Sequence, residues 1–182
     1  IVPSFTEPEA VLAAAGVPFQ HVVLAPPYEL ADAAVPEDAD LVIVGVGIIP
    51  NTDLAVAAGL EVDDGVIVDD HARTSDPDIV AAGDCVNQRI ARYDRRVRLE
   101  CVAAATEQAK VAAATICGNE AGLTALPWFW SDQYDLKLQI AGLSEGWDDT
   151  HVLRDAEGAV DTVLVFRAGR LIAVETVNQA GR

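Results

Sequence analysis

An acidic residue follows a short apolar run near the middle of the sequence, in a position where a carboxylate can bind ligand hydroxyls. The apolar run is Ile79–Ala82, and Gly83 and Asp84 follow it directly. Ligands of open α/β sheets bind beyond the carboxyl ends of the strands, and a carboxylate there accepts hydrogen bonds from hydroxyl groups. A strand that simply ends in a surface acid gives the same pattern, and spacing alone favours that simpler interpretation.

A basic run comes shortly after this acid. Five of the twelve basic residues fall within ten positions, namely Arg89, Arg92, Arg95, Arg96 and Arg98. Such a cluster can steer the docking of an acidic protein, and Lys110 would extend it. Blocks of like charge are more often solvated loops, and the sequence leaves both interpretations open.

The hydrophobic pattern predicts the elements that position these residues. The apolar run 40–47 ends in glycines and is typical of a strand buried on both faces. An Ala-rich segment, Glu100–Cys117, is expected to form a long helix with Glu107 and Gln108 facing outward. We further expect a short helix at 53–58, strands at 65–68, 79–82, 136–140, 151–154, 163–167 and 171–176, and a hairpin turn at 168–169.

These elements predict an α/β fold with two parts. Residues 40–122 carry the parallel-sheet pattern and the long helix, whereas residues 123–182 carry the period-two pattern of a small antiparallel α+β module. Residues 1–39 form an uncertain segment.

The composition describes a packed and strongly acidic chain. The formal net charge is −17, and such a surface repels nucleic acid and anionic membranes, so neither is an expected partner. No apolar run reaches transmembrane length. The three cysteines are too sparse for a disulfide framework or a zinc site, and we expect a cytoplasmic setting. Because the chain begins without Met, we expect it to be a fragment of a longer protein.

The segment Thr74–Asp84 (TSDPDIVAAGD) resembles the second FAD-binding motif of the pyridine nucleotide-disulfide oxidoreductase superfamily, and the motif is complete. The resemblance implies that Asp84 binds the ribityl chain of the flavin. Residues 40–51 (DLVIVGVGIIPN) are similar to the family's crossing from the nicotinamide domain into the FAD domain. This places Gly45 and Gly47 under the nicotinamide nucleotide, although the same glycines could merely end a tight strand.

A third match lies at the start of the long predicted helix. Residues 99–109 resemble the helix start that faces the flavin pyrimidine. The resemblance implies that a backbone N–H near Val102 holds a flavin carbonyl, and that Glu100 is the family's acid near the nicotinamide. A plain acid at a helix start is an equally good interpretation of Glu100. Ala103 and Ala104 stand where the family commonly has polar residues, so side-chain hydrogen bonds made there are missing.

The fourth match narrows the subfamily. PWFWSDQ at 127–133 looks like the signature of ferredoxin and rubredoxin reductases of the putidaredoxin reductase type. The resemblance implies that Trp130 lies beside the isoalloxazine near the electron exit. An aromatic core cluster is the alternative, which we retain for Trp128 and reject for Trp130.

Taken together, the resemblance implies the closing part of a Rossmann-like FAD/NAD(P)-binding domain followed by a small α+β C-terminal interface domain. The expected function is an FAD-dependent reductase that oxidises NAD(P)H and passes electrons to a small [2Fe–2S] ferredoxin or rubredoxin. Neither glycine-rich pyrophosphate loop of the family occurs in the chain, and nothing in it distinguishes NADH from NADPH. Two alternatives stay open: another enzyme of the same fold, and a truncated non-catalytic chain that folds or binds partners without flavin turnover.

Overall fold

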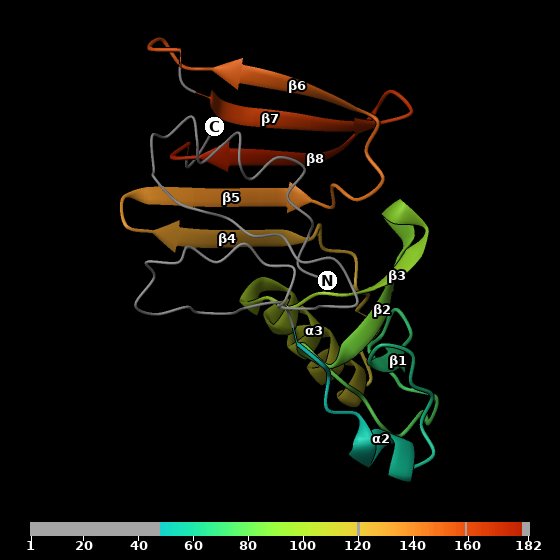
Figure 1. Ribbon diagram of the computed structural model, residues 1–182. Helices are drawn as coiled ribbons and strands as arrows, with labels where there is room; N and C mark the ends of the chain where they lie inside the picture. Colours follow the sequence, from blue (N-terminus) through green and yellow to red (C-terminus); the bar gives the residue numbers. More distant parts are fainter. Residues whose placement is uncertain (1–47, 120, 159, 180–182) are drawn as a thin grey trace, which may run out of the picture.

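The computed structural model describes residues 48–119, 121–158 and 160–179. Figure 1 shows two parts, a lower one with the long helix and a small sheet and an upper one made of a larger sheet. The lower part contains α2 (Asp53–Ala57), β1 (Val66–Val68), β2 (Val86–Ile90), the 3-10 helix η2 (Ala91–Tyr93), β3 (Arg95–Arg98) and α3 (Val102–Ile116). The upper part contains β4 (Trp128–Gln133), β5 (Leu136–Gly142), β6 (Asp149–Arg154), β7 (Val160–Arg167) and β8 (Arg170–Val177). This mixture confirms the expected α/β class. No helix in the described part of the chain is long and apolar enough to span a membrane.

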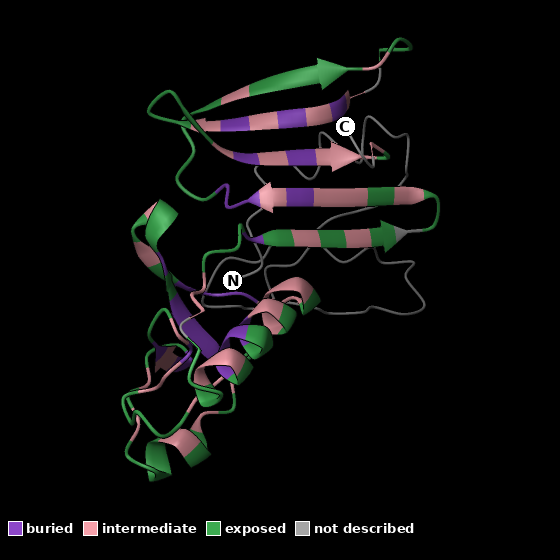
Figure 2. Cartoon of the chain, turned by 180° about the vertical axis from the view of Figure 1, so that it is seen from behind, coloured by how far each residue is buried: buried purple, intermediate pink, exposed green. Residues whose placement is uncertain are grey.

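The small sheet has the order β1-β2-β3. Strand β1 pairs in parallel with β2, and β2 pairs with β3 in an antiparallel hairpin closed by η2. The sequence pattern missed both strands of the hairpin because polar residues occupy buried positions in them, such as Asn87 and Gln88 in β2. Figure 2 shows β2 as one of the most buried strands of the lower part. The basic run therefore belongs to a packed hairpin and not to a solvated loop.

The strand expected at 79–82 is reduced to a single antiparallel bridge, between Arg73 and Val80. The Thr74 N–H donates to the Ile79 carbonyl at 2.9 Å, and the Ala81 N–H donates to the Ala72 carbonyl at 3.0 Å. The polar turn at 74–78 thus folds the apolar run back onto the residues before the turn instead of extending it in a sheet. Asp84 consequently follows a tight loop and not a full strand.

Helix α3 forms where the sequence predicts it, but one expected orientation is wrong. The residues that α3 buries are Gln108, Val111 and Ala112, spaced as one helix face. Val111 and Ala112 pack against buried Ala72. Gln108 is only 1% exposed, so it faces inward and not outward. An Ala-rich helix has little contrast between its faces, and for that reason the outward prediction for a polar side chain failed.

The larger sheet has the order β4-β5-β8-β7-β6, and all its neighbouring strands are antiparallel. Its four predicted strands and the turn at 168–169 are confirmed, since Arg167 pairs with Arg170 across that turn. Strand β4, which carries the two tryptophans, was not predicted. Figure 2 shows β6 as a largely exposed edge strand.

A tyrosine at the tip of the hairpin joins the two parts. The Tyr93 hydroxyl donates to the Ile172 carbonyl at 2.7 Å and accepts from the Leu143 N–H at 3.0 Å. Gly142 makes room for this contact, because a Cβ there would lie 2.8 Å from the Tyr93 hydroxyl and 2.2 Å from the Ile172 carbonyl oxygen. Its φ of +99° is also one that side chains rarely adopt. Residues 91–94 thereby fix the hairpin against the larger sheet.

Candidate functional site

A cavity of about 540 Å³ lies between the start of α3 and strand β4. Four parts of the chain surround it: the first turns of α3, the connecting segment 122–127, the two tryptophans of β4, and residues 88, 90 and 99 in or next to the β2–β3 hairpin. Most of the exposed lining is apolar, with Ile90, Leu99, Val111 and Leu123 among the contributors. Its size is within the range of roughly 300–1,000 Å³ that is usual for small-molecule and cofactor sites.

The N-terminus of α3 supplies the polar part of this wall. Val102 is the first residue of the helix, and no side chain caps the helix at Cys101. The first N–H groups of a helix have no partner within it, and the helix dipole favours negative charge beside them. Val102 is 66% exposed and lines the cavity together with Ala103 and Ala104. The two alanines leave the backbone as the only polar group offered at these positions.

Trp128 and Trp130 form the opposite wall. They are two residues apart on β4, and their rings stack with centroids 4.9 Å apart and an interplanar angle of 30°. Both side chains are partly exposed, at 43% for Trp128 and 37% for Trp130. The core position expected for Trp128 is therefore wrong, because alternate residues of a strand share a face and both rings meet the cavity.

Asp84 lies outside the cavity lining but is connected to it through Gln108. The Gly83 N–H donates to Gln108 Oε1 at 2.7 Å, and Gln108 Nε2 donates to Gln88 Oε1 at 3.1 Å. Gln108 and Gln88 both line the cavity. The Asp84 side chain is exposed. One buried amide thus fixes the turn that carries Asp84 relative to α3. Sequence reasoning missed the role of Gln108. The available signal was its position three and four residues before Val111 and Ala112, which places it on the same helix face.

A buried arginine connects the same turn to Glu100. The Arg98 side chain is 5% exposed and pairs with Glu100, whose side chain is 10% exposed. Arg98 also donates to the Asp64 carbonyl at 3.0 Å and to the carbonyl oxygens of Asp84 and Ile48 at 3.5 and 3.4 Å. Glu100 precedes the helix cap and does not line the cavity. Glu100 pairs with Arg98 and is neither an acid of the first helical turn nor part of the cavity wall.

Most of the basic run is engaged within the chain. Besides Arg98, the partners are Asp94 for Arg89, Glu145 for Arg95, and the carbonyls of Val68 and Asn87 for Arg96. Lys110 pairs with Glu107 at 2.5 Å. The run as a whole therefore does not present a free basic face. Gly45 and Gly47 lie outside the residues that the structure describes.

Comparison with known proteins decides the family. Residues 15–109, more than half of the chain, match the model described as pyridine nucleotide-disulphide oxidoreductase. The chain belongs to this family. Residues 128–182 match a second model, described as the reductase C-terminal domain.

Similar curated relatives include several ferredoxin reductases. Putidaredoxin reductase of Pseudomonas putida is 48% identical over 141 residues, which cover 78% of this chain and 33% of the relative. A ferredoxin–NAD(P)(+) reductase of a Sphingomonas species is 49% identical over 153 residues, covering 82% and 36%. A solved covalent putidaredoxin reductase–putidaredoxin complex matches with a TM-score of 0.71 and 49% identity, covering 78% of this chain and 34% of the solved one. The chain thus spans about a third of the length of these relatives and corresponds to their C-terminal part.

The described residues fit the ring end of the family's FAD. Members of this oxidoreductase family use FAD and NAD(P)H. A flat heteroaromatic ring needs an apolar slot with a few polar groups at its edge. The cavity provides apolar side chains, two stacked indoles and an uncapped helix N-terminus. Val102, Trp128, Trp130 and the turn at Asp84 are the groups that would hold such a ligand.

Proposed function

We propose that the chain forms the part of an NAD(P)H-oxidising reductase that holds the ring side of FAD and passes electrons to a small iron–sulfur protein. The observation that carries this proposal is the cavity between the uncapped start of α3 and the stacked pair Trp128–Trp130. Bound FAD would supply the hydride and single-electron chemistry, and the protein would supply position and electrostatics.

Each proposed residue has a defined task. The Asp84 carboxylate accepts a hydrogen bond from a ribityl hydroxyl, since an ionised carboxylate is a pure acceptor. The Val102 N–H donates to a carbonyl on the ring edge, where the dipole of α3 also stabilises negative charge on the reduced ring. Trp130 packs beside the ring system and covers it from water. Glu100, Gly45 and Gly47 stay assigned to the nicotinamide side as predictions.

The acceptor that we propose is a small [2Fe–2S] ferredoxin or a rubredoxin. Support comes from the relatives: one is solved in complex with putidaredoxin, and another is named as a rubredoxin reductase. All three cysteines of the chain are free, so we also propose a reducing, cytoplasmic setting. As domain limits we propose 1–39 for a remnant of the NAD(P)-binding domain, 40–122 for the FAD-binding part and 123–182 for the C-terminal domain.

A chimera tests this function. The chain replaces the matching C-terminal part of Pseudomonas putida putidaredoxin reductase, and NADH-dependent reduction of putidaredoxin is followed. We expect turnover above the level of the recipient lacking its own C-terminal part. A Trp130→Ala variant should lose most of it, whereas Trp147→Ala is the matched control because Trp147 is similarly exposed, at 41%, and lies outside the cavity lining.

Two outcomes would speak against the proposal. A folded chimera that holds flavin but reduces no acceptor would refute electron transfer by these residues. A folded chimera without flavin would favour the non-catalytic alternative. Equal losses in the Trp130 and Trp147 variants would refute the specific role of Trp130.

A further inference from the structure

A second, separate pocket of about 230 Å³ lies where the β2–β3 hairpin meets the β7–β8 turn. Three arginines reach it: Arg92 from η2, and Arg167 and Arg170 from the two sides of the turn. All three are exposed, and none of their side chains makes an ion pair or hydrogen bond with a residue that the structure describes. Like charges gathered around one hollow repel one another, and a bound anion would remove that cost.

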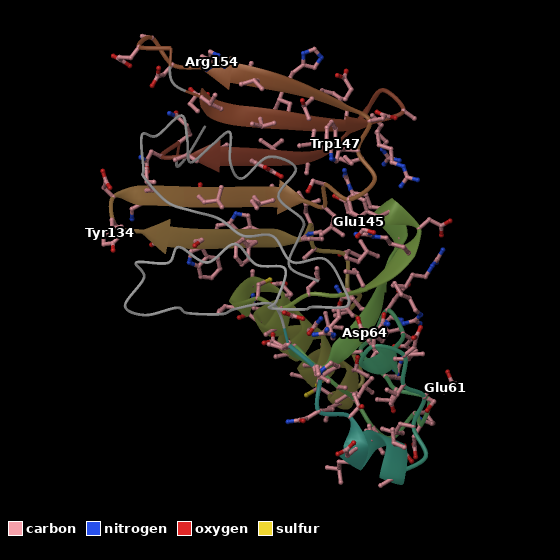
Figure 3. The ribbon with its side chains drawn as sticks, in the orientation of Figure 1. Glu61, Asp64, Tyr134, Glu145, Trp147 and Arg154 are labelled. Atoms are coloured by element: carbon pink, nitrogen blue, oxygen red, sulfur yellow. The ribbon has the colours of Figure 1, made fainter. Side chains whose placement is uncertain are left out.

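The carboxylates that border this pocket are already paired. Asp94 pairs with Arg89 at 2.5 Å, and Glu145 pairs with Arg95. Figure 3 shows Glu145 between the hairpin and the larger sheet. The three arginines therefore give the pocket a local excess of positive charge, in a chain whose formal net charge is −17. The sign of this local charge is opposite to that of the chain as a whole, so the overall composition does not account for it.

The backbone around the pocket holds the arginines in place. A Cβ at Gly146 would lie 3.4 Å from Arg167 Nη1 and 3.6 Å from its Cζ, so the guanidinium group lies directly over the Gly146 backbone. The Ala168 N–H donates to Asp148 Oδ2 at 2.6 Å, which fixes the turn between Arg167 and Arg170. The two hydrogen bonds of Tyr93 fix the hairpin that carries Arg92. A ligand that binds here would therefore have to order little of the backbone.

From this geometry we infer that the pocket binds a small multivalent oxyanion through Arg92, Arg167 and Arg170. Planar guanidinium groups bind phosphate and carboxylate oxygens bidentately. The pocket is smaller than the roughly 300–1,000 Å³ of cofactor sites, so it suits a phosphate or pyrophosphate group and not a whole nucleotide. No residue of its lining belongs to the larger cavity. The inference is therefore independent of the proposed reductase function.

Calorimetric titration of the 182-residue chain with inorganic pyrophosphate, at constant ionic strength, tests the inference. We expect a dissociation constant at or below about 1 mM, which corresponds to about −4 kcal/mol. Arg167→Gln and Arg170→Gln should each weaken binding about tenfold or more, because each removes a charge-assisted contact. Arg92→Gln should weaken it similarly. Lys137→Gln removes the same charge from an exposed residue of β5 outside the pocket, and should leave binding unchanged.

Three results would overturn the inference, provided that circular dichroism shows every variant to be folded. One is the absence of measurable pyrophosphate binding at concentrations several times the expected dissociation constant of about 1 mM. Another is an equal loss in Lys137→Gln and in the arginine variants, which would mean diffuse attraction without a site. The third is full affinity in Arg92→Gln, which would show that the site does not span the hairpin and the turn.

Discussion

Replacing Gln108 by leucine should destabilise the chain out of proportion to the size of the change. Gln108 is 1% exposed, accepts from the Gly83 N–H at 2.7 Å and donates to Gln88 at 3.1 Å. Leucine has a similar volume, so the main effect is the loss of both hydrogen bonds. A buried polar group left without a partner costs about 1–3 kcal/mol. Two such groups, the Gly83 N–H and the Gln88 side chain, give an expected loss of about 2–6 kcal/mol in the free energy of unfolding.

Urea denaturation followed by far-ultraviolet circular dichroism measures this loss. With a slope of roughly 2 kcal/mol per molar urea, the midpoint should fall by about 1–3 M while the slope stays the same. Glu107→Leu is the matched control on the neighbouring, partly exposed position, where we expect a change within about 0.5 kcal/mol. Equal midpoints for the two variants would refute the reasoning that Gln108 holds the Gly83–Asp84 turn.

Three further substitutions test the packing around the site by the same denaturation experiment. Tyr93→Phe removes two hydrogen bonds between the hairpin and the larger sheet and should cost about 1–3 kcal/mol; an unchanged midpoint would contradict this. Gly142→Ala forces a Cβ to 2.2 Å from a carbonyl oxygen and should lower the free energy of unfolding by about 1–3 kcal/mol or more. An unchanged midpoint would mean that the backbone there can move. Arg98→Leu removes the buried guanidinium group that pairs with Glu100 and should lower the free energy of unfolding by about 3–5 kcal/mol. Arg98→Leu combined with Glu100→Leu should recover part of that loss, and no recovery would show that the pair does not act as a unit.

The sequence predicted those parts of the fold where hydrophobic periodicity is strong. Burial alternates from residue to residue along much of β5, β7 and β8, and helix α3 contains no strong helix breaker, so these elements were found. The hairpin β2–β3 was missed because its buried positions hold Asn87, Gln88 and Arg98, which form hydrogen bonds with distant segments. Local propensity cannot foresee partners supplied from distant segments.

The sequence suggested individual residues for the candidate site but not the connections between them. Val102 and Trp130 do line one cavity, whereas Asp84 and Glu100 lie beside it. Gln108 looked like a solvated helix residue because its partners, the Gly83 N–H and Gln88, are about twenty or more positions away in the chain. The three-arginine pocket combines residues 92, 167 and 170, and only the docking of the hairpin onto the larger sheet brings them together.

The visible absorption spectrum of the purified chimera and its Asp84→Ala variant, after removal of unbound FAD, tests the central claim most directly. We expect the chimera to retain oxidised flavin. Asp84→Ala should retain far less, because loss of a charge-assisted hydrogen bond of about 1.5–3 kcal/mol weakens binding by tenfold or more. Equal flavin content in the two folded proteins would contradict the assignment of Asp84, and a folded chimera without flavin would contradict the claim that this chain holds the ring side of FAD.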